Sequence, residues 1–196
     1  MNAQGKRSGE TAREYAYRMI REQVISLELK PGEAFNDMEF AAKIGVSRTP
    51  VREAVIQLSE ESRIIEIFPQ RGMRIALIDV ELVEEARSLR VLLEKQIAGM
   101  CCEMATEEDI KWLQENVGLQ EFYMENSRPE MVMQLDDEMH HKLFMICHRE
   151  LTYGMCQKLA IHYDRIRSLS VNTVKDNTII EDHRKIIQFI AEHKKE

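Results

Sequence analysis

Residues 45–54 read Gly-Val-Ser-Arg-Thr-Pro-Val-Arg-Glu-Ala, a pattern typical of the start of a helix. Ser47 is a good N-cap, because its hydroxyl can accept a hydrogen bond from the backbone N–H groups of the first turn. Pro50 falls in that first turn, where its missing N–H removes no intrahelical hydrogen bond. Arg48 and Arg52 are four residues apart and therefore share one face of the helix. The segment predicts a short helix with two stacked guanidinium groups near its N-terminus.

The opposite face of this helix holds Val51, Val55 and Leu58 at helical spacing, which predicts that it packs on a core. A helix of this kind suits the major groove of DNA, where Arg can contact phosphates or pair with O6 and N7 of guanine. A surface helix with solvated arginines fits the segment equally well when it is taken alone. The neighbouring elements must distinguish the two interpretations.

The residues before this segment predict a flexible tail, a helix and a turn, over residues 1–10, 11–27 and 30–32. Asn36 and Glu39 then form a capping-box pattern, in which Glu39 can reach back to the backbone N–H of Asn36. This opens a second short helix, which Gly45 ends in a left-handed C-terminal position. Two short helices joined by a turn with glycine, the second with a polar face, form the helix-turn-helix pattern.

After residue 61 the apolar period changes from 3.6 to about 2, which predicts a hairpin. Its strands are expected near residues 64–68 and 73–77, on either side of the turn Pro69-Gln70-Arg71-Gly72. As a wing, this hairpin would place Arg71 and Arg74 beside the helix that starts at Ser47, which would be the recognition helix. Gly72 would let the backbone of the wing approach a groove or a phosphate closely. The hairpin could instead only cover the three helices. The arginine pair upstream favours contact with DNA.

Beyond a boundary at about residue 79, the apolar spacing is helical to residue 192. Helices are expected over residues 80–104, 107–123, 129–148, 152–169 and 178–192. The predicted fold is mainly α: a winged helix-turn-helix of three helices and a two-stranded wing, followed by an antiparallel all-α bundle. The expected domains are a tail at 1–10, a DNA-binding domain at 11–78 and an effector-binding and dimerisation domain at 79–196.

Composition indicates a globular cytoplasmic protein. The chain of 196 residues is 44% apolar and 31% charged, with no apolar run near the ~20 residues that span a membrane and no signal-peptide pattern. Its four cysteines have no CxxC spacing. The net charge of −7 is uneven, because residues 1–78 hold 12 basic and 11 acidic residues and residues 79–196 hold 15 and 23. A local arginine patch on a near-neutral module fits site-specific DNA binding better than indiscriminate coating.

Three motifs, Lys30-Pro31-Gly32-Glu33, residues 46–54 and residues 69–72, together resemble the GntR family of bacterial transcription regulators. The helical remainder resembles the FCD effector domain of the FadR-like branch. The resemblance implies that Arg48 and Arg52 contact DNA, that Ser47 and Thr49 lie near phosphates, and that Gly72 forms the wing tip.

Two positions depart from the family pattern. Met38 replaces an arginine that many members have, so that one DNA contact is expected to be absent and more of the base recognition to rest on the recognition-helix arginines. Ser62 replaces a usual glycine, and it would cost about 1 kcal/mol if that position needs a positive φ.

In the second domain, the resemblance implies metal ligands. Asp136 and His140 match the family's Asp-x-x-x-His motif and His183 matches its later acidic-His motif. Asp136 and His140 also lie four residues apart, as a chelating pair on one helix face must. Carboxylate with imidazole suits Zn²⁺, Ni²⁺ or Mn²⁺ more than Ca²⁺. The family's last histidine is expected beyond Glu196, and His193 is too early to replace it, so either a last helix is missing or the site is incomplete.

The leading hypothesis is a homodimeric regulator that binds a pseudo-palindromic double-stranded operator, with no membrane partner, under the control of a small carboxylate effector. Arg90 and Arg167 are candidate effector ligands, although ion pairs within the acidic bundle would explain them equally well. A second domain that only dimerises is the alternative. A helical metalloenzyme is less favoured, because the sequence has no HExxH, GxSxG or glycine-rich phosphate motif. His141, Cys147 and His148 are expected to be surface or packing residues. The sequence does not distinguish a repressor from an activator.

Overall fold

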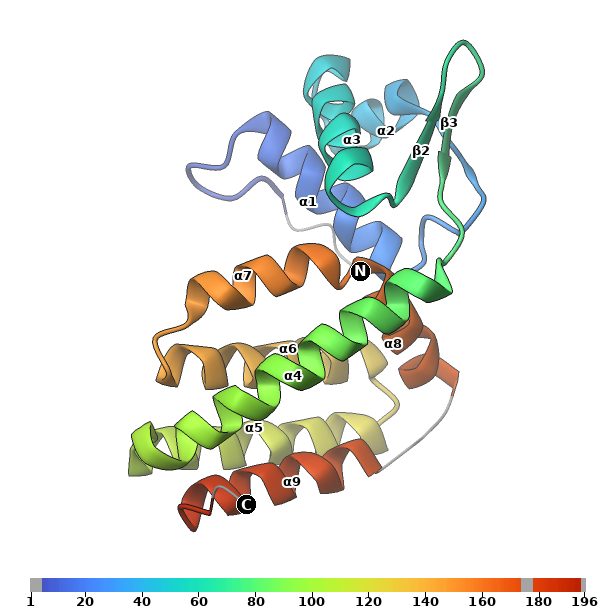
Figure 1. Ribbon diagram of the computed structural model, residues 1–196. Coiled ribbons are helices and arrows are strands. Elements are labelled where there is room, and N and C mark those ends of the chain that lie inside the picture. The colour runs from blue at the N-terminus through green and yellow to red at the C-terminus, as the bar shows by residue number, and fades with distance from the viewer. Residues whose placement is uncertain (1–4, 174–177, 195–196) are drawn as a thin grey trace. The chain divides into compact units, whose positions relative to one another are not determined.

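The computed structural model describes residues 5–173 and 178–194, which form helices and one small sheet (Figure 1). The mainly helical fold predicted from the sequence is confirmed. The chain divides into two compact units. The N-terminal unit comprises Met1–Val83 with Lys158–Arg165, and the helical unit comprises Glu84–Gln157 with Ile166–Glu196.

The N-terminal unit contains a winged helix-turn-helix (Figure 1). Its elements are α1 (Ala12–Ile25), β1 (Ala34–Phe35), α2 (Asp37–Ile44), α3 (Arg48–Ser62), β2 (Ile65–Phe68) and β3 (Gly72–Ile75). α3 packs against both α1 and α2. Val51, Val55 and Leu58 of α3 are buried in the core, as the spacing predicted.

The sheet has three strands in the order β1-β3-β2, rather than the two expected. β3 pairs antiparallel with β2 and, on its other side, with β1, where Phe35 lies opposite Met73. Two residues are too few to show a period-2 pattern, so the sequence gave no sign of β1. Phe35 is buried in the core, which fixes this short strand in place.

The helix ends near the recognition helix agree only in part with the predicted caps. Gly45 is left-handed, with φ 72°, as expected. Ser47 is the N-cap of α3, as predicted, but within the described chain its side chain does not make the expected capping hydrogen bond. Asn36 accepts from the N–H groups of Met38 and Glu39. The Glu39 carboxylate accepts from Asn36 Nδ2 instead of the backbone N–H, so the predicted capping box is incomplete.

The helical unit is built mainly from six of the described helices. They are α4 (Val80–Met104), α5 (Glu107–Glu125), α6 (Pro129–Ile146), α7 (Glu150–Leu159), α8 (Ile161–Thr173) and α9 (Thr178–Ala191). Residues Lys158–Arg165, at the junction of α7 and α8, belong to the N-terminal unit. α5 packs against α6 and α9. The single helix expected over residues 152–169 is wrong, because the helix breaks at Ala160. Neither glycine nor proline marks that break, and the apolar pattern continues through it.

Within residues 5–173 and 178–194, no helix is both long and apolar enough to cross a membrane.

The end of α3 corrects the expectation for Ser62. Ser62 lies in the last helical turn, where its hydroxyl donates to the carbonyl of Leu58 at 2.9 Å. The left-handed residue is its neighbour Arg63, with φ 55°. Any strain of a non-glycine residue at this turn is therefore at Arg63.

We expect Arg63→Gly to raise the free energy of unfolding by up to about 1 kcal/mol, because glycine adopts the left-handed conformation without the penalty of a side chain. Urea unfolding followed by circular dichroism measures this change. Arg63→Ala is the matched control, since alanine also removes the exposed guanidinium but keeps the backbone strain. Equal effects of the two substitutions would contradict the assignment.

Candidate functional site

The N-terminal end of α3 presents the two arginines singled out by the sequence, one turn apart on the same face. Their side chains are 51% and 63% exposed. Both contact the same carboxylate: Nε of Arg48 lies 2.9 Å and Nε of Arg52 lies 3.5 Å from Oδ2 of Asp37, the first residue of α2. The side chain of Asp37 is only 4% exposed. A buried acid on one helix therefore links two exposed arginines on the next.

The N-terminus of α3 is open to an anion. Ser47, Arg48 and Thr49 are exposed, and in the described structure the side chain of Ser47 does not cap the helix. The N–H groups of a first helical turn carry a partial positive charge and bind phosphate oxygens well. These three residues therefore combine backbone donors, hydroxyl groups and a guanidinium on one surface.

The wing contributes less charge than expected. Arg71 is exposed in the turn between β2 and β3, and Gly72 adopts φ 98°, a value that glycine takes without penalty. Arg74, the other arginine predicted beside the recognition helix, donates to the carboxylate of Glu66 on the neighbouring strand. It also lies over the ring of Phe68 at 5.3 Å. Among the wing arginines, Arg71 thus has the more exposed position.

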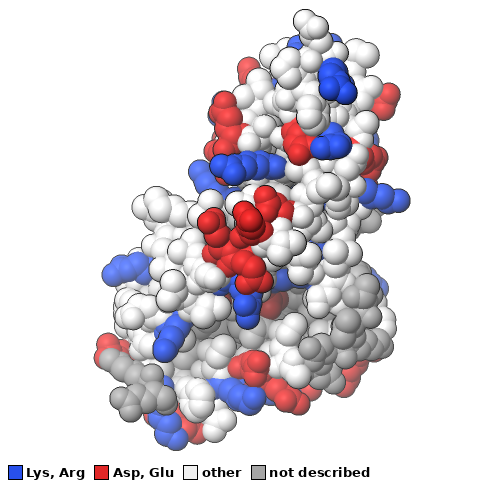
Figure 2. Space-filling model, turned by 45° about the vertical axis from the view of Figure 1, so that its right-hand side comes forward, with Lys and Arg blue, Asp and Glu red and all other residues white. Residues whose placement is uncertain are grey.

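Basic and acidic side chains are interspersed on the face shown in Figure 2, where blue groups lie among red ones. This agrees with a net charge of −7. A protein with such a surface relies on local arginine contacts, because its overall charge does not attract nucleic acid.

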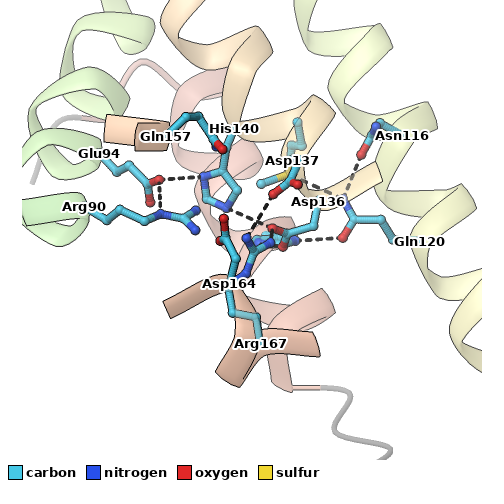
Figure 3. A network of polar contacts seen from close by, with 12 residues as sticks. Arg90, Glu94, Asn116, Gln120, Asp136, Asp137, His140, Gln157, Asp164 and Arg167 are labelled. Carbon is cyan, nitrogen blue, oxygen red and sulfur yellow. Dashed lines mark hydrogen bonds and ion pairs between the residues drawn. The ribbon is translucent and has the colours of Figure 1, made fainter. Parts of the chain in front are cut away.

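A second candidate site lies among the helices of the helical unit (Figure 3). Asp136 and His140 of α6 and His183 of α9 each bring one ligand atom within 4.8 Å of the others. Nε2 of His140 is 3.8 Å from Oδ2 of Asp136, and Nε2 of His183 is 3.5 Å from its Oδ1. All three side chains are largely buried. The structure therefore brings together the three residues that the sequence singled out as metal ligands.

Two buried amides fix the protonation of His183. Nε2 of Gln120 donates to Oδ1 of Asn116 at 2.7 Å, which leaves Oε1 of Gln120 as an acceptor for Nδ1 of His183 at 3.0 Å. Burial lowers the pKa of His183 to about 4, so the ring is neutral with its proton on Nδ1. Its Nε2 lone pair then faces the Asp136 carboxylate. In this arrangement two acceptors face each other, and a cation between them would relieve the repulsion.

His140 is oriented from its other side. Its Nδ1 lies 3.2 Å from Oε1 of Glu94, in a contact that lacks hydrogen-bond geometry, and the same oxygen accepts from Nε of Arg90 at 2.8 Å. Burial opposes ionisation of Glu94, but His140 and Arg90 outweigh it and hold the pKa of the carboxyl below its usual value. A carboxylate on one imidazole nitrogen and a ligand position on the other is the common arrangement around protein-bound metals.

Arg167 of α8 supplies a positive charge to the cluster. It donates to Oδ2 of Asp136 and, at 2.9 Å, to Oδ1 of Asp137. Burial raises the pKa of Asp136, but the positive charges around the carboxyl, that of Arg167 first, more than compensate, so Asp136 is ionised. Both candidate effector ligands, Arg90 and Arg167, thus take part in ion pairs with acidic residues of the bundle.

Other candidate ligands lie elsewhere. Nδ1 of His193 lies 2.7 Å from the carbonyl of Cys102, outside the cluster. His141 stacks on the ring of Tyr153 at 4.6 Å, and Cys147 is buried with its Sγ 3.4 Å from that of Cys101. The packing roles expected for His141 and Cys147 agree with these contacts.

The sequence interpretation missed four contributors: Glu94, Asn116, Gln120 and Asp137. Glu94 follows Arg90 by four residues, a spacing that could have indicated the ion pair. Asn116 and Gln120 have the same spacing, but nothing local connects them to His183, which is 63 residues beyond Gln120. Asp37 was also missed as the partner of Arg48 and Arg52.

Two family models match the chain. Residues 12–75 match the bacterial regulatory proteins of the gntR family, and residues 85–196 match the FCD domain. The chain belongs to the GntR family and carries an FCD domain. It is a helix-turn-helix transcriptional regulator with an effector-binding domain, as the motifs implied.

Relatives and solved structures agree with this assignment. The chain is 30% identical over 158 residues to the HTH-type transcriptional repressor RspR of Escherichia coli K12, which covers 81% of this chain and 69% of that protein. It is 30% identical over 190 residues to an HTH-type transcriptional regulator in an unstable DNA locus of Streptomyces ambofaciens, covering 94% and 78%. The structure of E. coli McbR/YncC has a TM-score of 0.81 at 18% identity, with coverage of 94% and 88%. That likeness supports the fold alone.

Proposed function

We propose that this regulator reads its operator with the first turn of α3. Arg48 and Arg52 would contact bases or phosphates in the major groove, Ser47 and Thr49 would bind phosphates, and the wing would add Arg71 with Gly72 at its tip. The observation that carries this proposal is the exposure of both guanidinium groups on one turn of a helix whose opposite face is buried.

A homodimer would place one recognition helix on each half of a pseudo-palindromic operator in the cytoplasm. Its effector would be a small carboxylate that binds near Arg90 and Arg167, because guanidinium pairs with carboxylate through two parallel hydrogen bonds. Such a ligand controls DNA binding only if it prefers one of two arrangements of the protein. Repression is the favoured outcome, since the relative RspR is named a repressor.

The residues of the cluster fit a divalent transition metal such as Zn²⁺, Ni²⁺ or Mn²⁺. Asp136, His140 and His183 would hold it, with Glu94 and Gln120 orienting the two imidazole rings. The neutral His183, with its lone pair directed at a carboxylate, supports this proposal. A bound cation would supply a coordination position for the effector carboxylate. His193 would not be a ligand, because it lies against the carbonyl of Cys102.

Replacing Arg48 should weaken operator binding. We expect Arg48→Ala to bind a duplex selected by the wild-type protein from random sequences about 10- to 100-fold less tightly, because one or two charge-assisted contacts are lost. Fluorescence anisotropy measures the affinity. Arg63→Ala, which removes an exposed charge at the other end of α3, should bind nearly as wild type. If Arg48→Ala binds as tightly as wild type, α3 does not read the operator in this way.

Replacing Gln120 should weaken metal binding without removing a ligand. We expect Gln120→Leu to lower the affinity for Zn²⁺ or Ni²⁺ about 10- to 100-fold, because His183 loses the partner that fixes its proton on Nδ1. Isothermal titration of chelator-treated protein measures this affinity. His141→Gln, which changes a histidine stacked on Tyr153 outside the cluster, should bind as wild type. Purified protein without a bound transition metal, and without metal uptake in titration, would contradict the site.

Replacing Arg167 should reduce the response to ligand more than the binding of DNA. If carboxylic acids alter operator affinity, Arg167→Lys should need at least about tenfold more ligand, because lysine keeps the charge but cannot form a bidentate pair. Arg128→Lys is the matched control, since Arg128 pairs with Glu130 outside the cluster. The same anisotropy assay, titrated with small mono- and dicarboxylates, measures both quantities. A second domain that only dimerises predicts no ligand effect in any variant.

A further inference from the structure

Asp37 is an acidic residue at the surface that we propose binds DNA, which is itself strongly negative. Its carboxylate lies beside the guanidinium groups of Arg48 and Arg52, and its side chain is 4% exposed. An acid so close to a DNA-reading surface lowers the attraction for phosphates. Its presence there needs a reason beyond charge.

The helix dipole is one general reason for an acid at this position, but it explains only part of the geometry. Glu39 lies in the same first turn of α2 and gives the same favourable interaction with the helix N-terminus. Glu39 is exposed and hydrogen-bonds to Asn36, whereas Asp37 is buried and directed at α3. The two acids therefore share a charge and a turn of helix, and they differ in their contact with the arginines.

The pairing holds the arginines by one atom each. Oδ2 of Asp37 faces Nε of Arg48 and Nε of Arg52, the nitrogen nearest the chain in each guanidinium. The terminal nitrogens of both groups carry the donors that contact O6 and N7 of guanine. A guanidinium that donates from Nε, as that of Arg48 does, keeps its terminal donors available. It has already lost much of the rotational freedom that a long side chain loses on binding.

Breaking the ion pairs between Asp37 and these arginines costs free energy. If both turned towards the nearest phosphates, a buried carboxylate would remain without a partner, and an unpaired buried charge is strongly unfavourable. Contacts with a correctly placed base edge can be made while Nε stays on Asp37. The ion pairs thus disfavour binding through phosphates alone more than they disfavour binding to the correct bases.

We infer that Asp37 is a positioning residue that sets the sequence specificity of the recognition helix. The inference rests on the proposed role of Arg48 and Arg52 in operator binding. Asp37 does not contact DNA: it directs the two arginines towards base edges and suppresses binding to arbitrary sequence.

The test compares Asp37→Asn with Glu39→Gln in the full-length protein. Each substitution removes one negative charge from the first turn of α2, and only the first removes the partner of the arginines. We expect Asp37→Asn to lower the ratio of affinities for the selected operator and for a scrambled duplex about tenfold, with tighter binding to the scrambled duplex. Glu39→Gln should leave that ratio within about twofold of wild type. Fluorescence anisotropy at two salt concentrations gives both affinities.

A double-mutant cycle with Arg48→Ala separates positioning from a structural effect. If Asp37 acts through Arg48, the loss of specificity caused by Asp37→Asn should shrink by about half or more in the Arg48→Ala background. Asp37→Glu, which keeps the charge but moves the carboxylate, should give a ratio between that of Asp37→Asn and that of wild type. Equal ratios for Asp37→Asn and Glu39→Gln, or an undiminished effect in the Arg48→Ala background, would overturn the inference. Wild-type affinity of Arg48→Ala itself would instead overturn the proposed recognition helix.

If Asp37→Asn does not fold, as judged by circular dichroism, Asp37→Glu decides the question. The longer side chain moves the carboxylate relative to the two Nε atoms while keeping its charge. A positioning role then predicts a ratio between that of wild type and that of Arg48→Ala. A ratio equal to that of wild type would overturn the inference.

Discussion

A buried carboxylate needs a cation, because an unpaired charge inside a protein is strongly disfavoured. The same requirement organises both units of this regulator. In the N-terminal unit, Asp37 forms ion pairs with Arg48 and Arg52 of α3. In the helical unit, Asp136 pairs with Arg167 and lies beside ring nitrogens of His140 and His183. In each unit one acid fixes the groups on which our functional proposals rest.

Asp37 and Asp136 differ in how accessible their paired side chains are to a ligand. Asp37 faces arginines that are more than half exposed, so the groups it holds stay available to a large polyanion such as DNA. Asp136 lies in a cluster whose three candidate ligands are largely buried, so it suits a metal ion or a small molecule better than a macromolecule. The difference in exposure matches the division of a GntR-family regulator into a DNA-binding domain and an effector domain.

Local signals made much of this structure predictable. The helix–turn–α3 segment followed from Gly45, Pro50 and the apolar face of α3, all read within about a dozen residues. The pair Asp136 and His140 followed from the resemblance to the family's Asp-x-x-x-His motif, and their spacing of four on one helix agreed with it. Features that depend on distant residues did not follow: no pattern in the sequence indicated that Gln120 would meet His183, or that Asp37 would be buried against α3. The strand β1 and the break at Ala160 were missed because each is too short to alter a period.

The Asp136 cluster also suggests why a metal and a carboxylate effector would support each other. Arg167 now takes Oδ2 of Asp136, while Oδ1 faces the lone pair of His183. A cation held by both histidines would compensate the charge of Asp136 and weaken its hold on Arg167. The guanidinium would then have donors for an incoming carboxylate, which in turn would stabilise the cation. Because such coupling is reciprocal, the effector should raise the affinity for the metal by the same factor as the metal raises the affinity for the effector.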